Sequence, residues 1–155
     1  MPASQRDNKS EKPIETEFRL ARKSLIKRVG SKALYGDVVD GIGKDLFGAR
    51  WRGVHTQKNY PVKNGYQIIN TDYDGPGAHW VALYITPRTI YVYDSYGRTS
   101  TNLLPLLVRR AGKRAVVDAD YDPEQIGYTS QVCGVLCLAW LLMVSRYGVR
   151  KALFI

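Results

Sequence analysis

Cysteine and histidine are scarce in this chain of 155 residues. The sequence contains two cysteines, Cys133 and Cys137, and two histidines, His55 and His79. Two cysteines cannot form the disulfide framework of a small secreted domain, and these four residues lack the paired-thiol spacing of structural zinc sites. The composition therefore indicates a reducing intracellular compartment, and we expect no metal site.

The sequence also lacks a long hydrophobic run. The most apolar stretch, residues 132–144, is too short to span a bilayer and predicts a buried core helix. Residues 1–12 are polar and contain no apolar segment of the kind found in secretory signals. We therefore expect a protein that stays soluble inside a cell or particle and does not bind a membrane.

Acidic residues are outnumbered by basic ones. The chain has 23 Lys and Arg against 14 Asp and Glu, which gives a formal net charge of +9. Such a surplus favours association with an acidic partner such as nucleic acid. The surplus gathers in two segments that contain no acid, residues 18–36 and 98–117. Either segment could bind DNA or serve only as a solvated surface.

The hydrophobic content is sufficient for one packed domain. Hydrophobic residues make up 45% of the sequence, and the length suits a single core. Residues 1–13 are rich in polar residues and are expected to form a flexible tail. The remaining residues, 14–155, are expected to form a single domain.

Hydrophobic periodicity and turn residues predict an α+β fold. Helices are expected at 14–29, 103–111 and 133–147, and strands at 66–70, 79–85, 89–94 and 114–117. Residues 35–52 carry four glycines and are expected to form a loop with a short helix. The strands at 79–85 and 89–94 are expected to pair as a hairpin through the turn at Thr86–Arg88.

Cys133 is a candidate nucleophile because it begins the apolar helix. Unpaired amides and the positive end of the helix dipole lower the pKa of a thiol at this position and favour thiolate. The plainer interpretation is a buried structural cysteine, which is the usual fate of this residue. Cys137, one turn further along, is expected to be of that kind.

His79 and Asp94 are a candidate base and its orienting acid. His79 opens one predicted hairpin strand and Asp94 closes the other, so the carboxylate can reach the imidazole and stabilise its charged form. Each residue alone has an ordinary interpretation, as a structural histidine and as part of a turn. His55 lies in a polar segment and is the weaker candidate.

A fourth role, stabilising the negative charge that develops on a substrate carbonyl, needs hydrogen-bond donors. The backbone amide of Cys133 and an upstream glutamine side chain could supply them. Gln125 and Gln131 both qualify by composition, and either could instead be a surface loop residue.

Together these motifs resemble the adenovirus endoprotease (adenain) family and, more distantly, the SUMO and other ubiquitin-like-protein proteases. The matching segments are Ile68–Asp72, Gly75–Trp80, Tyr93–Gly97, Gln125 and Cys133–Cys137. The likeness covers roughly residues 53–144. The order of His before Asp before Cys is opposite to that of papain, in which Cys precedes His.

The resemblance implies a role for each matching residue. Cys133 corresponds to the nucleophile, His79 to the general base and Asp94 to the acid that orients it. Gln125 corresponds to the oxyanion glutamine and Trp80 to the tryptophan beside the catalytic histidine. The implied reaction is peptide-bond cleavage through a thioester acyl-enzyme.

The resemblance also implies a fold and a substrate cleft. The fold would be a papain-like cysteine protease core, in which a small, mostly antiparallel sheet packs between helices and the nucleophile begins a buried helix. Trp80, Gly77 and Gly134 would contact the substrate, which such enzymes cut close to small residues.

Three departures from the family pattern limit the likeness. Asp94 stands where adenain has Glu, as in the ubiquitin-like-protein proteases. Gln125 precedes Cys133 by eight positions, further than in these families, so Gln131 remains an alternative. The chain has no third cysteine to bind an activating peptide through a disulfide. No cofactor is required for the chemistry, although DNA or a noncovalent peptide could stimulate it.

The resulting expectation is a monomeric viral or virus-derived thiol protease. It would mature the virion by cutting capsid and core precursors near glycine-containing sites, in the particle and in the cytoplasm or nucleus of the infected host cell. One alternative is a protease that removes ubiquitin or SUMO from host proteins. Another is a basic, noncatalytic DNA-binding virion protein.

Overall fold

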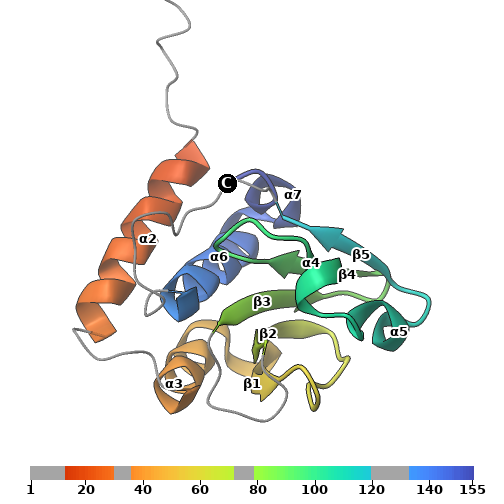
Figure 1. Ribbon diagram of the computed structural model, residues 1–155. Coiled ribbons are helices and arrows are strands. Elements are labelled where there is room, and N and C mark those ends of the chain that lie inside the picture. The colour runs from red at the N-terminus through yellow and green to blue at the C-terminus, as the bar shows by residue number, and fades with distance from the viewer. Residues whose placement is uncertain (1–12, 30–35, 72–78, 120–132) are drawn as a thin grey trace, which may run out of the picture.

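The chain was analysed as a computed structural model, which describes residues 13–29, 36–71, 79–119 and 133–155 (Figure 1). The first described element is α2 (Pro13–Val29), which begins one residue before the predicted helix. It buries Ile14, Phe18, Ala21 and Leu25 on one face. The spacing of three and four residues between them explains why this segment forms an amphipathic helix.

Five strands form one mixed sheet. They are β1 (Trp51–Thr56), β2 (Gly65–Asn70), β3 (Trp80–Ile85), β4 (Thr89–Tyr93) and β5 (Ala115–Asp118), which lie side by side in that order. The hairpin of β3 and β4 is antiparallel, as predicted, and so is the pair of β2 and β3.

The sheet is not mostly antiparallel, because both edge pairs are parallel. β1, which the sequence did not predict as a strand, runs parallel to β2, and β5 runs parallel to β4. The segment between β4 and β5 contains two short helices. A helical connection of this kind returns the chain to the starting end of the sheet and produces parallel strands.

Alternating residues of the strands bury both faces of the sheet. Ile68, Ala82 and Tyr93 pack with α2, α3 (Gly36–Phe47) and α6 (Cys133–Tyr147) on one face, whereas Ile69 and Val81 belong to a second cluster on the other. The period of two residues in a strand produces this division. Figure 1 shows α2 and α6 on one side of the sheet and α4 (Ser100–Leu103) and α5 (Leu107–Ala111) on the other.

The central helix, α6 (Cys133–Tyr147), has the predicted bounds. It is buried from Cys133 to Leu141 because α2 covers one side and the sheet the other. α7 (Val149–Ala152) follows Gly148 and accepts a hydrogen bond of 2.9 Å from the Trp140 indole at the carbonyl of Ala152. Within the described ranges, no helix combines the length and the apolar character needed to cross a membrane.

The expectation of a loop with a short helix at residues 35–52 was only partly right, because a longer helix replaces most of the loop. Residues Gly36–Phe47 form the helix α3, followed by a 3₁₀ turn at Gly48–Arg50 and then β1. A Cβ atom at Gly43 would lie 2.3 Å from the Trp51 ring, so this glycine lets the helix approach the indole. Gly43 therefore serves close packing, whereas Gly48, with a φ of 55°, begins the 3₁₀ turn.

The predicted helix at 103–111 is divided in two. The structure has α4 (Ser100–Leu103) and α5 (Leu107–Ala111), with Pro105 between them. Proline has no amide hydrogen and clashes with the preceding turn, which accounts for the break. Leu104, which follows α4 directly, and Leu107 and Ala111 of α5 pack into the second cluster.

Candidate active site

His79 lies immediately before β3 and is 6% exposed. Its backbone carbonyl accepts a hydrogen bond of 3.0 Å from the amide of Thr71, which extends the pairing of β2 with β3 by one residue. This contact fixes the backbone of His79 at the end of the sheet. The imidazole is thereby carried by a rigid element.

Asp94 follows β4 directly, at the same end of the sheet as His79. The pairing of Ala82 with Tyr93 sets the register that brings the two residues together. Nε2–H of His79 donates a hydrogen bond to Oδ1 of Asp94. Their side chains are 7% and 1% exposed. The predicted contact across the hairpin is therefore present.

A tight turn after Asp94 brings Arg98 back to the carboxylate. The Gly97 amide donates to the Asp94 carbonyl at 2.9 Å, and Gly97 adopts a φ of 70°. Glycine is favoured in this left-handed region because it has no Cβ. The backbone amide and Nε of Arg98 then donate to Oδ2 of Asp94 at 2.9 and 3.0 Å.

These contacts keep Asp94 ionised although it is buried. Burial by itself raises the pKa of the carboxyl, but hydrogen bonds from His79 and Arg98 outweigh that effect and lower the pKa to about 2. Asp94 is therefore an anion at neutral pH. It can orient the imidazole of His79 and stabilise its protonated form.

An aromatic ring packs against the imidazole. The Tyr96 ring lies 5.1 Å from the His79 ring between centroids, with the planes inclined by 40°. The guanidinium of Arg98 lies 4.8 Å from the centre of the same Tyr96 ring. Tyr96 therefore lies in contact range of both the imidazole and the guanidinium.

Cys133 is the first residue of α6 and is 2% exposed. Backbone hydrogen bonding by Trp80, Gly134 and Cys133 itself acts to lower the pKa of its thiol. One turn later, the Cys137 thiol donates to the Trp80 carbonyl at 3.5 Å. The first turns of α6 therefore contact Trp80, the residue that follows His79.

The Cys133 thiol is less acidic than its position in the helix predicts. Burial raises its pKa, and the nearby charge of Asp94 acts in the same direction. The backbone hydrogen bonds oppose this rise without overcoming it. The expectation of a lowered thiol pKa was therefore wrong, because it counted the helix terminus and not the burial.

The second nitrogen of the imidazole is free for proton transfer. Nε2 of His79 is engaged by Asp94, while Nδ1 is buried and has no hydrogen-bond partner within the described part of the chain. Buried polar atoms normally have a partner, so an open position on this ring is notable. Nδ1 is the nitrogen that remains to accept a proton.

The other expected site residues are placed as follows. Trp80 is half-buried and its indole ends beside Gly36, whereas Gly134 is buried in the first turn of α6. Gly77, Gln125 and Gln131 lie outside the described residues.

The second cysteine and the second histidine are not part of this site. Cys137 is fully buried, as expected. Nε2 of His55 contacts the Arg52 carbonyl at 2.5 Å, on β1. No group of three His, Cys, Asp or Glu side chains suited to holding a metal ion occurs in the part of the chain that the structure describes.

Tyr96 and Arg98 were not predicted from the sequence as members of the site. The segment Asp94–Arg98 suggested a turn, but its type was not inferred. A glycine three residues after Asp94 was the available signal. It permits the turn that returns the next residue to the carboxylate.

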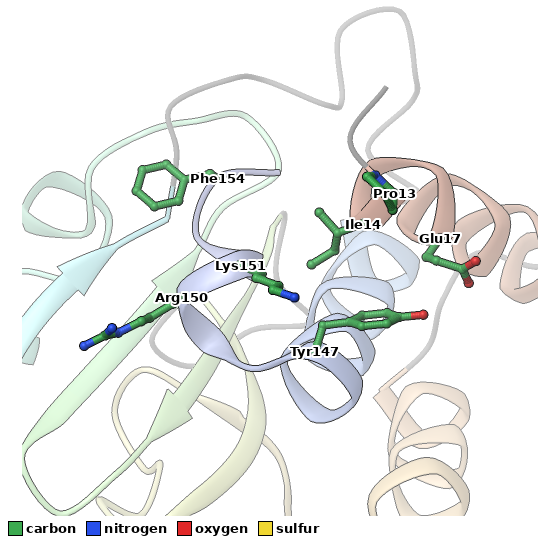
Figure 2. Close-up of a pocket in the computed structure, with 7 residues that line it drawn as sticks. All are labelled: Pro13, Ile14, Glu17, Tyr147, Arg150, Lys151 and Phe154. Atoms are coloured by element: carbon green, nitrogen blue, oxygen red, sulfur yellow. The ribbon is translucent and has the colours of Figure 1, made fainter. Parts of the chain in front are cut away.

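A separate hollow of about 580 Å³ lies between the first turn of α2 and α7 (Figure 2). It is lined by Pro13, Ile14, Glu17, Tyr147, Arg150, Lys151 and Phe154. Tyr147 ends α6 and Cys133 begins it, and a helix of this length spans roughly 20 Å. The hollow is therefore not part of the site at His79 and Asp94.

The sequence matches no known protein family and no curated protein. Any assignment of function therefore depends on the motifs and on the geometry of the residues described above. Of these residues, His79, Asp94 and Cys133 come from three elements, and the contacts of Asp94 and Trp80 link them.

Proposed function

We propose that this chain is a cysteine endopeptidase in which Cys133, His79 and Asp94 act as a catalytic triad. The observation that carries the proposal is the buried imidazole, whose Nε2 is bound to an ionised Asp94 and whose Nδ1 has no hydrogen-bond partner among the described residues. Cys133 begins α6, and the backbone of Trp80, the residue after His79, is close enough to act on the pKa of its thiol. A nucleophile, a base and an orienting acid are the parts that acyl transfer requires.

The reaction would proceed through a thioester. Nδ1 of His79 removes the thiol proton while Sγ of Cys133 attacks the carbonyl carbon of the scissile peptide bond. His79 then gives that proton to the departing amine, and the C–N bond breaks. Water, deprotonated by His79, hydrolyses the thioester and restores the thiol.

The raised thiol pKa bears on how the nucleophile is activated. A thiol that keeps its proton at neutral pH needs a base during the attack itself. The positive charge that forms on His79 is stabilised by the carboxylate of Asp94. This favours general-base activation in the resting site over a preformed ion pair.

The oxyanion that forms during attack needs donors. The backbone amide of Cys133, in the first turn of α6, would supply one of them. An amide side chain from Gln125 or Gln131 would complete the pair of donors, as the resemblance to adenain implies. The substrate contacts proposed for Trp80, Gly134 and Gly77 follow from the same resemblance.

The proposed substrates are viral capsid and core precursors cut near glycines during virion maturation. This proposal rests on the resemblance to adenain, as do a papain-like core, a virion and infected-cell location, and stimulation by DNA or a noncovalent peptide. Removal of ubiquitin-like proteins from host conjugates is the alternative substrate class, and both classes need the same triad.

Cleavage assays with matched cysteine variants test the proposal. The purified chain would be incubated with glycine-containing reporter peptides, ubiquitin-like fusions and capsid-precursor proteins, with and without double-stranded DNA. We expect cleavage by the unmodified chain and by Cys137→Ala, and none by Cys133→Ala. Circular dichroism would confirm that both variants fold.

Two results would contradict the proposal. One is full cleavage by the Cys133→Ala variant, which would mean that another group is the nucleophile. The other is no cleavage of any substrate under any condition, which would favour the noncatalytic DNA-binding alternative. Cleavage of the ubiquitin-like fusions alone would retain the triad and change the substrate class.

A further inference from the structure

We infer that Arg98 is a positioning residue of the proposed triad, which acts by holding Asp94 in the orientation and charge state that His79 needs. The inference rests on the proposed function, because it assigns Arg98 a role in that reaction. The effect of Arg98 on Asp94 and His79 in the resting site can also be measured when no peptide is cleaved.

Arg98 and His79 bind different oxygens of one carboxylate. Oδ1 of Asp94 accepts the imidazole N–H, while Oδ2 accepts both the backbone amide and Nε–H of Arg98. A carboxylate with one oxygen held at two points cannot rotate freely. The remaining oxygen is thereby directed at His79.

The charge of Arg98 also offsets the burial of Asp94. The Asp94 side chain is 1% exposed, and a buried carboxylate is stable as an anion only when it is paired and hydrogen-bonded. His79 is neutral whenever it acts as a base. Arg98 is then the permanent cation in contact with Asp94, and it remains one at any working pH.

The guanidinium is itself held in place. It lies over the ring of Tyr96, which in turn packs against His79. The turn through Gly97 brings Arg98 back to the side chain of Asp94. Four side chains, His79, Asp94, Arg98 and Tyr96, therefore form a closed set of contacts.

The exposure of Arg98 separates this role from a purely structural one. Its side chain is 46% exposed, so its contact with Asp94 faces solvent on one side and contributes little to stability as an ordinary ion pair. A residue that only stabilised the fold would change the amount of folded protein. A positioning residue changes the rate of each folded molecule.

The kinetic test compares Arg98→Met, Arg98→Lys and, as a control, Arg88→Met. Methionine retains the apolar stem over Tyr96 and removes the donor, and Arg88 is an exposed arginine at the opposite end of the same hairpin. Per titrated active site, we expect Arg98→Met to lower kcat about tenfold and to leave KM within about twofold. Lysine should recover part of the loss, and Arg88→Met should show none.

A double-mutant cycle tests whether Arg98 acts through Asp94. If it does, Arg98→Met should have little further effect on kcat in the Asp94→Asn background. A full tenfold loss in that background would overturn the inference, because Arg98 would then act independently of Asp94. An unchanged kcat in Arg98→Met itself would overturn it too.

A second measurement does not depend on cleavage. In the Cys133→Ala chain, ¹⁵N NMR of the imidazole rings would report which nitrogen of His79 carries the proton, and His55 would serve as an internal reference. We expect a fixed Nε2–H tautomer, which becomes a mixture in Arg98→Met and stays fixed in Arg88→Met.

The two readouts separate the inference from the proposed function. Loss of the fixed tautomer without any measurable cleavage would support the role of Arg98 on Asp94 and contradict the endopeptidase. A tautomer unaffected by Arg98→Met would overturn the inference, whether or not the chain cleaves peptides.

Discussion

Asp94 shows how neighbouring side chains change the chemistry of a single residue. Its burial favours the protonated form, yet His79 and Arg98 keep it an anion with a pKa of about 2. The contact with His79 could be predicted from the sequence, because a hairpin places the first residue of one strand opposite the last of the other. The contact with Arg98 could not, since it depends on the type of turn.

The depressed pKa of Asp94 predicts a loss of stability in acid. An unfolded aspartate has a pKa near 3.9. Above that pH the ionised carboxylate stabilises the folded state, and this stabilisation is lost as the pH falls toward 2. The stabilisation is about 2 kcal/mol. We expect the free energy of unfolding, measured with urea, to fall between pH 5 and 2 by roughly that amount.

The Asp94→Asn variant isolates this contribution. It should be less stable than the unmodified chain at pH 7 and should show a smaller decline toward acid. Asp45→Asn is the control, because Asp45 forms an exposed ion pair with Arg28 worth less than about 1 kcal/mol. An Asp94→Asn variant with an unchanged acid decline would contradict the account of this residue.

Cys133 shows where reasoning from single residues fails. Its position at the start of a helix was predicted, and the structure has α6 begin there. The direction of its pKa shift was not, because the burial of this thiol depends on elements distant in the sequence, such as β3, whose first residue Trp80 acts on it. Gln125, Gln131 and Gly77 remain predictions, since they lie outside the described residues.

At the scale of elements, strong periodic patterns were predictive and glycine-rich segments were not. The helices at α2 and α6 and the strands β2 to β5 match expected segments to within about two residues, which is the usual precision for such boundaries. β1 was missed, and α3 is longer than the short helix expected there. Their glycines were taken as turn signals, although Gly43 serves the close packing of α3 against the Trp51 ring.

Two glycines of α3 predict opposite effects of alanine. A Cβ at Gly43 would lie 2.3 Å from the Trp51 ring, whereas at Gly41 nothing lies within 4 Å. We expect Gly43→Ala to destabilise the fold by about 1–3 kcal/mol through overpacking. Gly41→Ala should stabilise it by about 0.5–1 kcal/mol, because alanine is the better helix former.

Chemical denaturation of both variants would measure this difference, and circular dichroism would show that the helix content is retained. Equal effects of the two substitutions would contradict the proposed packing of α3 against β1. An unchanged stability in Gly43→Ala would show that the Trp51 indole can move aside without cost.

At the scale of the whole molecule, the two faces of the sheet are covered differently. α6, α2 and α3 cover one face, and α4, α5 and the buried Tyr60 cover the other. The sequence predicted the α+β class but not the parallel edge pairs of the mixed sheet. Strand direction at an edge depends on how the connecting segments cross the sheet, which periodicity does not reveal.

Part of the positive charge of the molecule lies on the outer face of α2. Arg19, Lys23 and Lys27 are exposed there at intervals of four residues, which places them in one row along the helix. If this row binds DNA, each lysine contributes by releasing counterions from the phosphates. Binding should then weaken steeply as salt is raised.

Neutralising two of these lysines tests the role of the row. We expect the Lys23→Gln/Lys27→Gln double variant to bind double-stranded DNA more weakly. The slope of the logarithm of the binding constant against the logarithm of the salt concentration should become smaller by about one per lysine. Lys58→Gln/Lys63→Gln, which has the same net charge, is the control. Equal losses in both double variants, measured by fluorescence anisotropy, would indicate that only net charge matters.

The most direct test of the triad is covalent labelling with a substrate-like electrophile. A glycine-ending peptide vinyl sulfone adds a thiol across its double bond, and intact-mass and peptide mapping locate the adduct. We predict one adduct, on Cys133, formed at least about 100-fold more slowly in His79→Gln and at an unchanged rate in Cys137→Ala. Labelling of Cys133 at equal rates with and without His79, or no labelling of Cys133 at all, would contradict the account.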